Sequence, residues 1–309
     1  TSWDLSESLI NNASGTITYN GTSITIERSF THNGTFDLTG KTITFDNSAA
    51  NDSSVISCSQ TIAGSITINK TGTATSTLGS DCTIAGNFRR TDGAFTNPTS
   101  TRTLSIQGNF NASTTDEFGG TNLTLAFTGT STQTIAMDST TVTSTLQINK
   151  SGGIASLTRA FTSNSASSTC DIVEGTFILA GFTLSCGGVF TVQDGGVLQL
   201  QGGETVTSPT IEGGSTVVYT GDGDSGADTY VVTSLASTYS NLTASSTDGA
   251  TDTFLLGAAL TVSSTLTLTA GTLDASSTNL GITVGGNWTD TGAGAFTERS
   301  GTVTFNGSG

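Results

Sequence analysis

Short stretches in which apolar residues alternate with threonine recur along the whole chain. TLTLT at 265–269 and GTVTF at 301–305 are typical, and LQL at 198–200 is a shorter case. Alternation of this kind puts the apolar side chains on one face of an extended strand and the polar ones on the other. The pattern therefore predicts many short β-strands, each with one face toward a core and the other toward solvent.

Aromatic residues mark a longer repeat. Phe118 and Phe127 are nine residues apart, and the same interval closes four other groups of aromatic or aliphatic residues. Phe88 precedes Phe110 by 22 residues, and a second motif recurs as SITINKTG at 65–72 and TLQINKSG at 145–152. Repeats of 20–50 residues indicate solenoids, propellers or other arrays.

A coil of about 22 residues with strands this short predicts a right-handed parallel β-helix, an all-β solenoid. One coil cannot bury its apolar positions, whereas stacked coils cover one another and pair their main-chain groups. The length gives about 14 coils (309/22). The alternative is a pair of β-sandwiches, which would show hairpin turns but no fixed aromatic interval.

The aromatic residues of the repeat are expected to stack inside the coils. They are Trp3, Tyr19, Phe30, Phe36, Phe45, Phe88, Phe95, Phe110, Phe118, Phe127, Phe190, Tyr219, Trp288, Phe296 and Phe305. We expect one continuous solenoid over residues 1–309, with an irregular inserted region around 190–230.

The first and last coils carry similar sequences, SGTITYNGTS at 14–23 and SGTVTFNGSG at 300–309. The chain thus ends in the phase of the coil in which it begins. Two interpretations remain open: the residues belong to a longer array, or the end coil of each subunit continues the stack of the next. Unpaired strand edges at the ends of a stack invite another chain, and head-to-tail contacts that do not close produce filaments.

Charged residues are scarce, at 11% against a usual ~25%. The polar surface must therefore consist largely of Ser, Thr, Asn and Gly. The net charge is −15 with only nine Lys and Arg, which excludes a nucleic-acid partner. The longest apolar run, FILAGFTL at 177–184, is far shorter than the ~20 residues of a membrane span.

Four cysteines fall into two local pairs. Cys58 and Cys82 are 24 residues apart, about one coil, and Cys170 and Cys186 are 16 apart. Four cysteines allow three connectivities, of which the two local disulfides are favoured. The alternative is a set of buried free thiols in a cytosolic protein. A zinc site is not expected, because no CxxC pair occurs and His32 is the single histidine.

One acidic loop has the composition of a cation site. TGDGDSGADTY at 220–230 places Asp222, Asp224 and Asp228 among glycines. Alternating acidic residues in such a loop can surround Ca²⁺ with oxygens. The loop resembles part of a calcium-binding loop but lacks the closing Glu of an EF-hand. The alternative is a solvated acidic insertion, and no other cofactor is expected.

Catalytic residue patterns are weak, and we expect no enzyme. A Ser–His–Asp triad would have to use His32, in FTHNGTF at 30–36, where a surface turn is expected instead. Arg89 and Arg90 form the one basic pair that a lyase or hydrolase groove would use to hold an anionic sugar. A chain this acidic would repel such a substrate.

Residues 259–309 carry a family resemblance. ALTVSSTLTLTAGTLDASSTNLGI at 259–282 and VGGNWTDTGAGAFTERSGTVTFNGSG at 284–309 resemble the repeats of large secreted bacterial or archaeal surface proteins. These are β-solenoid proteins broadly similar to filamentous-haemagglutinin and autotransporter passenger domains. The resemblance implies export, an extracellular or cell-surface location and a structural or adhesive role, and it supplies no catalytic residues.

Together these features predict a non-enzymatic extracellular structural protein, a segment or subunit of a surface filament, stalk or fibre. Its partners would be copies of itself or further repeats, end to end. Two alternatives remain open: an adhesin that binds surface glycans along its exposed faces, and a polysaccharide lyase or hydrolase built on a β-helix.

Overall fold

The computed structural model describes residues 2–47, 53–112, 116–137, 142–248 and 252–307. These residues contain no helix, and 52% of them lie in strands. The chain divides into two compact units, residues 1–170 with 186–188 and residues 171–185 with 189–309. The single continuous solenoid over residues 1–309 stays a prediction.

The first unit is built from twenty short strands. They are β1 (Ser2–Leu5), β2 (Leu9–Asn11), β3 (Thr16–Ile17), β4 (Ser23–Ile26), β5 (Phe30–His32), β6 (Thr35–Phe36), β7 (Thr42–Asp46), β8 (Ser54–Cys58), β9 (Ser65–Asn69), β10 (Thr75–Leu78), β11 (Cys82–Ile84), β12 (Phe88–Asp92), β13 (Ala94–Thr96), β14 (Arg102–Ile106), β15 (Phe110–Ala112), β16 (Phe118–Gly119), β17 (Leu123–Phe127), β18 (Gln133–Met137), β19 (Thr145–Leu157) and β20 (Phe161–Thr162).

The second unit contains the remaining strands. They are β21 (Cys170–Ile178), β22 (Leu184–Ser185), β23 (Phe190–Val192), β24 (Gly196–Leu200), β25 (Thr210–Ile211), β26 (Thr216–Tyr219), β27 (Thr229–Val231), β28 (Thr238–Tyr239), β29 (Asn241–Ser245), β30 (Thr253–Leu255), β31 (Leu260–Val262), β32 (Leu266–Asp274), β33 (Ile282–Val284), β34 (Trp288–Thr297) and β35 (Val303–Phe305). Within the predicted irregular region, long loops separate β24 from β25 and β26 from β27.

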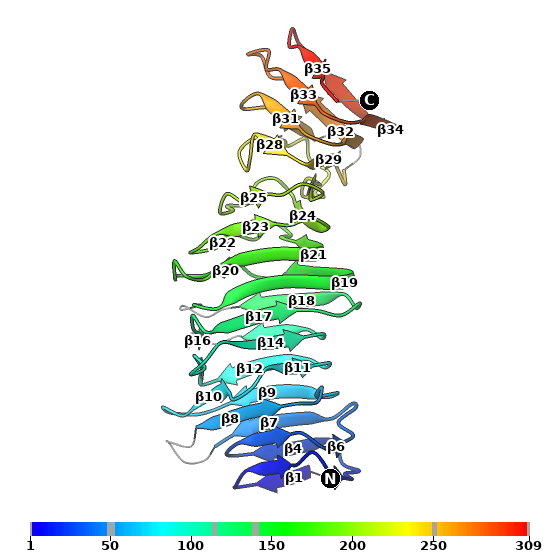
Figure 1. Cartoon of the computed structure of the whole chain (residues 1–309). Coiled ribbons are helices and arrows are strands. Elements are labelled where there is room, and N and C mark those ends of the chain that lie inside the picture. The colour runs from blue at the N-terminus through cyan, green and yellow to red at the C-terminus, as the bar shows by residue number, and fades with distance from the viewer. Residues whose placement is uncertain (1, 48–52, 113–115, 138–141, 249–251, 308–309) are drawn as a thin grey trace. The chain divides into compact units, whose positions relative to one another are not determined.

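Strands pair in parallel with the strand one coil away. Phe88 of β12 lies beside Phe110 of β15, 22 residues later, and Leu104 of β14 lies beside Leu125 of β17. Figure 1 shows β11, β14 and β17 as successive layers of the first unit. The predicted parallel β-solenoid with coils of about 22 residues is confirmed, with about 13 turns.

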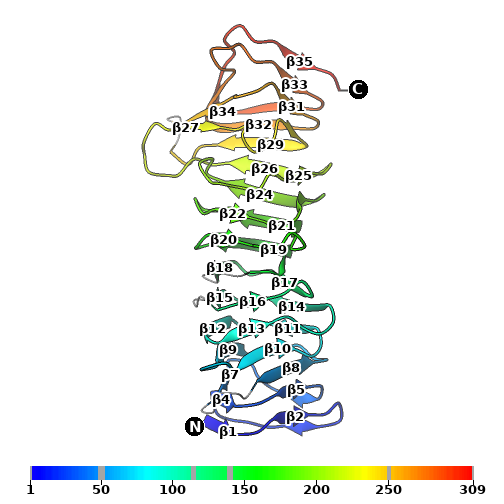
Figure 2. The same ribbon diagram turned by 90° about the vertical axis from the view of Figure 1, so that its left-hand side faces the viewer.

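A second sheet forms another face of the first unit. Its strands follow the order β16-β13-β10-β8-β5-β2, so neighbours in the sheet belong to successive coils. Figure 2, turned by 90° from Figure 1, brings β8, β10, β13 and β16 toward the viewer. Within each coil the chain passes from one sheet to the other. Every coil therefore contributes side chains to a common interior.

Phenylalanine rings stack along this interior in two columns. The rings of Phe88 and Phe110 lie 5.5 Å apart and nearly parallel, and those of Phe95 and Phe118 lie 5.2 Å apart. The columns meet edge to face, with Phe110 and Phe118 at 5.3 Å and 86°. Offset and edge-to-face pairs add about 0.5–1.5 kcal/mol each beyond area burial.

The aromatic residues assigned to the core differ in burial. Eleven are at most 9% exposed: Tyr19, Phe30, Phe36, Phe45, Phe88, Phe95, Phe110, Phe118, Phe127, Phe190 and Tyr219. Trp3, Trp288 and Phe296 are half-buried. Phe305 is 62% exposed, because β35 pairs only with β33 in the described chain and no strand covers its other side.

Three basic side chains are enclosed in the first unit. Lys70 and Arg90 are 0% exposed and Lys150 is 1% exposed. Lys70 Nζ donates to the main-chain carbonyl of Glu27 and, at 3.0 Å, to that of Asp46. Because these acceptors follow β4 and end β7, one ammonium group links three successive coils.

Lys150 forms a second link of this kind. Its Nζ donates to the carbonyl of Ser131 at 2.8 Å and to Gln133 Oε1 at 2.5 Å. The amide of Gln133 in turn donates to the carbonyls of Ile106 and Gly108, at 2.8 and 2.6 Å. Burial lowers the pKa of Lys150. The repeated motif INK thus places its lysine inside the solenoid, where carbonyl dipoles offset part of the desolvation cost.

Both predicted disulfides are present. Cys58–Cys82 joins β8 to β11 across a separation of 24 residues, and Cys170–Cys186 spans 16 residues. No described cysteine is free. The coil length accounts for the first pair, since one turn brings the two positions together.

Replacing Cys58 and Cys82 together with alanine is expected to lower the free energy of unfolding by about 3 kcal/mol, because the unfolded chain gains the entropy of an open loop. Urea unfolding of the variant and of the oxidised wild type measures the difference. Adding a reductant should destabilise the variant less than the wild type. A variant as stable as the oxidised wild type would contradict this expectation.

Candidate functional site

An acidic cluster lies in the second unit, where two successive coils meet. The loop after β26 carries Asp222 and Asp224, and Asp248 follows β29. Tyr219 of β26 pairs with Ala244 of β29, so the segments that leave these strands start side by side. Each of the three aspartates offers a carboxylate oxygen, and the three oxygens lie within 4.8 Å of one another.

The two segments are held together by hydrogen bonds. The main-chain N–H of Thr247 donates to the carbonyl of Thr220 at 2.8 Å, and its hydroxyl donates to the same oxygen at 3.1 Å. Gly221 has φ +68°, and a Cβ there would lie 2.0 Å from Asp252 Oδ2. Glycine is therefore required at the point where the loop turns away from β26.

Asp228, the third residue of the sequence prediction, lies beside this group and is not a member of it. Partial burial and the charges of Asp222, Asp224, Asp252 and Asp248 raise the pKa of Asp228. Its main-chain N–H faces Asp252 Oδ1 at 3.3 Å. Further carboxylates thus lie beside the three that converge.

Asp248 was not predicted from the sequence, because it lies outside the acidic loop at 220–230. The signal was present in the coil length: Tyr219 and Ala244 are paired across 25 residues, and Asp248 follows Asp222 by 26. Adding one coil length to the residue number of an acidic residue therefore gives the position that lies beside it in the next coil.

Two buried side chains lie next to the cluster. Asp252 is 0% exposed and accepts a hydrogen bond from Ser246 Oγ at 2.7 Å. Tyr230 is 8% exposed, and its buried hydroxyl forms no hydrogen bond of ordinary geometry. Burial, followed by the charges of Asp222 and Asp252, raises the pKa of Tyr230. The hydroxyl therefore remains protonated beside carboxylates.

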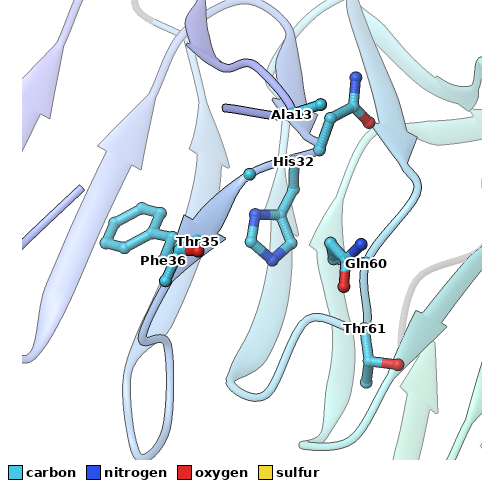
Figure 3. A pocket seen from close by; sticks show the side chains of 8 residues that line it. Ala13, His32, Thr35, Phe36, Gln60 and Thr61 are labelled. Carbon is cyan, nitrogen blue, oxygen red and sulfur yellow. The ribbon is translucent and has the colours of Figure 1, made fainter. Parts of the chain in front are cut away.

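A separate pocket lies in the first unit around His32, with a volume of about 330 Å³. Figure 3 shows the imidazole between Phe36 and the side chain of Gln60, with Thr61 beyond. The ring stacks on Phe30 at 5.8 Å. The residues that line the pocket are mostly polar and include no carboxylate, so they provide no acid–base partner for a triad.

The expectation that His32 lies on a surface turn is wrong. Its side chain is 2% exposed, because it is the last residue of β5 and shares the inward face with Phe30. Burial lowers the pKa of His32, against a smaller opposing effect from the main chain of Thr61. The imidazole is therefore neutral at physiological pH, and its Nδ1 is buried without a hydrogen-bond partner.

The basic pair of the sequence is divided between the two faces of β12. Arg89 is exposed, whereas the guanidinium of Arg90 is enclosed and lies 5.4 Å from the centre of the Phe118 ring. Arg90 Nη1 donates to the carbonyls of Asp116 and Glu117 at 3.1 and 2.6 Å. The two residues do not form a joint anion-binding surface.

The fold places the chain in the class of parallel β-solenoids. No protein-family model matches it, and comparisons with curated proteins and with solved structures likewise give no match. The described residues contain no helix long and apolar enough to cross a membrane.

Proposed function

We propose that this chain is a non-enzymatic structural protein, a segment or subunit of an extracellular filament, stalk or fibre. The observation that carries the proposal is the linking of coils by buried cations. In a solenoid each coil contacts only its neighbours, so cohesion depends on bonds between coils. Lys70 and Lys150 each take part in hydrogen bonding that spans three coils.

Two disulfides support an extracellular setting. Cys58–Cys82 and Cys170–Cys186 suggest a non-reducing environment, because cytosolic thiols are normally kept reduced. The scarcity of Lys and Arg favours the same setting, since it leaves few sites for trypsin-like proteases.

End-to-end assembly is the second part of the proposal. Within the described residues β35 pairs with β33 alone, and Phe305 on β35 is 62% exposed. A parallel coil added beside β35 would pair its main-chain groups and cover this ring. The added coil would come from further repeats or from another copy.

Electron microscopy of the purified chain at rising concentration tests this assembly. We expect fibres whose length grows with concentration, and we expect Phe305→Asp to shorten or abolish them, because a charge would be buried against the next coil. Val189→Asp is the matched control, since Val189 is also an exposed apolar residue, at 61%. Separate particles at every concentration, or equal effects of the two substitutions, would contradict end-to-end stacking.

A glycan-binding role is the second candidate, and the polar pocket beside His32 favours it. Glycan-array binding by a non-assembling form, lost on Gln60→Ala, would support an adhesin over a purely structural protein. Arg89 and Arg90, on opposite faces of β12, give no support to a polysaccharide lyase.

A further inference from the structure

We propose that Asp222, Asp224 and Asp248 bind one calcium ion and thereby link two successive coils of the second unit. The site goes beyond the structural role proposed above and does not depend on it. Asp222 and Asp224 belong to the loop after β26, and Asp248 belongs to the segment after β29. Bound calcium would therefore bridge segments that are separate in sequence.

The separation of the carboxylates suits calcium. Their oxygens lie within 4.8 Å of one another. Ca²⁺ binds oxygens at 2.3–2.6 Å, so oxygens on opposite sides of the ion are about 4.6–5.2 Å apart. Mg²⁺ binds at 2.0–2.1 Å, demands near-ideal octahedral geometry and gives up its waters reluctantly. Oxygens no more than 4.8 Å apart can share one Ca²⁺, whose flexible coordination tolerates unequal spacing.

The second unit supplies no basic side chain to balance this cluster. The sequence contains neither Lys nor Arg between Arg159 and Arg299. Arg299 itself forms a bidentate pair with Asp274, at 3.0 and 2.6 Å. Asp228 and the fully buried Asp252 add further negative charge beside the three carboxylates. A cation from solution is thus the available source of compensation.

Tyr230 is the second, independent indication of a bound ion. Its side chain is nine-tenths buried, and its hydroxyl points toward Asp222 without forming a hydrogen bond of ordinary geometry. A buried donor left in this way is uncommon, because a buried polar group without a hydrogen bond destabilises the folded state. A small closure of the loop around a cation would bring the carboxylate of Asp222 within reach of the hydroxyl, which would then orient it.

The loop is already shaped for this closure. The N–H of Gly226 donates to Asp224 Oδ1 at 2.6 Å, and the paired hydrogen bonds from Thr247 to Thr220 hold the two segments together. These contacts fix the carboxylate of Asp224 and the two segments in place before an ion binds.

Isothermal titration of the full chain with CaCl₂, after removal of metals with EDTA, tests the proposal. We expect one Ca²⁺ per chain, with a Kd of about 10⁻⁴ M, as in extracellular calcium modules. Mg²⁺ at the same concentrations should bind at least tenfold more weakly. The absence of saturable binding at millimolar Ca²⁺, or equal binding of Mg²⁺, would overturn the proposal.

Single substitutions identify the ligands. Asp222→Asn and Asp248→Asn should each weaken Ca²⁺ binding at least tenfold, whereas Asp290→Asn should leave it unchanged. Asp290 is a matched control, because it is exposed, lies in the same unit and accepts an N–H bond from Gly292 as Asp224 does from Gly226. Unchanged affinity in Asp248→Asn would overturn the bridging of two coils.

Measurements on the metal-free protein show whether a substitution has simply disrupted the fold. Without Ca²⁺, Asp248→Asn should be at least as stable as the wild type, because one repelling charge is removed. Added Ca²⁺ should raise the melting temperature of the wild type and of Asp290→Asn but not that of Asp248→Asn. An equal rise in all three would overturn the assignment.

Terbium luminescence shows whether the bound ion lies near Tyr230. Tb³⁺ is an oxygen-binding substitute for Ca²⁺ that emits when a nearby tyrosine transfers its excitation energy. We expect tyrosine-sensitised emission that Ca²⁺ displaces and that falls sharply in Tyr230→Phe. Emission that is unchanged in Tyr230→Phe would place the ion elsewhere and overturn the proposal.

Discussion

Replacing Arg90 with methionine is expected to lower the free energy of unfolding by about 4 kcal/mol. The guanidinium is fully enclosed, donates to the carbonyls of Asp116 and Glu117, and lies over the ring of Phe118. Methionine fills part of the same space but removes the hydrogen bonds from the charged guanidinium, which contribute about 1.5–3 kcal/mol each. The carbonyl of Glu117 keeps the N–H of Phe95 as a donor. Urea unfolding followed by circular dichroism measures the loss.

Arg89→Met is the matched control for this experiment. The two arginines are neighbours on β12, but the side chain of Arg89 points to solvent. Its replacement should change stability by no more than about 0.5 kcal/mol. If Arg90→Met does not fold, Arg90→Lys provides a milder test, because it keeps the charge and loses the planar set of donors. Equal effects of Arg89→Met and Arg90→Met would contradict the enclosed position.

Replacing Phe110 with alanine is expected to cost about 4 kcal/mol. Phe110 is 1% exposed, stacks on Phe88 at 5.5 Å and meets Phe118 edge to face. The substitution removes buried apolar area and leaves a cavity. The flanking coils cannot close this cavity without breaking the main-chain hydrogen bonds between them. The same urea measurement applies, and Phe110→Leu should recover more than half of the loss.

Phe305→Ala provides the comparison for the core. Both residues belong to strands of the solenoid, but Phe305 is 62% exposed and has a strand on one side only. We expect a change of about 0.5 kcal/mol in the isolated chain. A loss as large as that of Phe110→Ala would show that the ring is enclosed and that the described burial of β35 is wrong.

The coil length was the part of the fold that the sequence could predict. Phe88 and Phe110 are one period apart in sequence and side by side in the structure, and the same period brings Cys58 to Cys82. Parallel stacking repeats one environment at each turn, so a regular interval translates directly into contacts. Phe305 shows the limit, because burial depends on whether another coil follows.

The burial of basic side chains could not be predicted from the composition. Lysine and arginine are mostly exposed in proteins, and a basic pair such as Arg89 and Arg90 suggests a surface. The enclosed position of Lys70 and Lys150 depends on carbonyls of other coils, which local sequence does not specify. The repeated INK motif was nevertheless a usable signal, because it occurs at the same place in the coil both times.

The candidate cation site was half predictable. Asp222 and Asp224 follow from the composition of their loop, whereas Asp248 joins them only through the register of β26 and β29. The sequence assigned the third position to Asp228, which is close in the chain. The strand pairing determines which residues of successive coils lie side by side. Loops of unequal length change the sequence separation of such neighbours by several residues.

The enclosure of lysine also changes the chemistry of the surface. The chain has three lysines, and two of them, Lys70 and Lys150, are sealed from water. Lys41 is left as the lysine whose amine a dissolved reagent can reach in the folded state. Cross-linkers, fluorescent esters and activated supports that acylate lysine side chains would therefore modify one defined lysine of the folded chain.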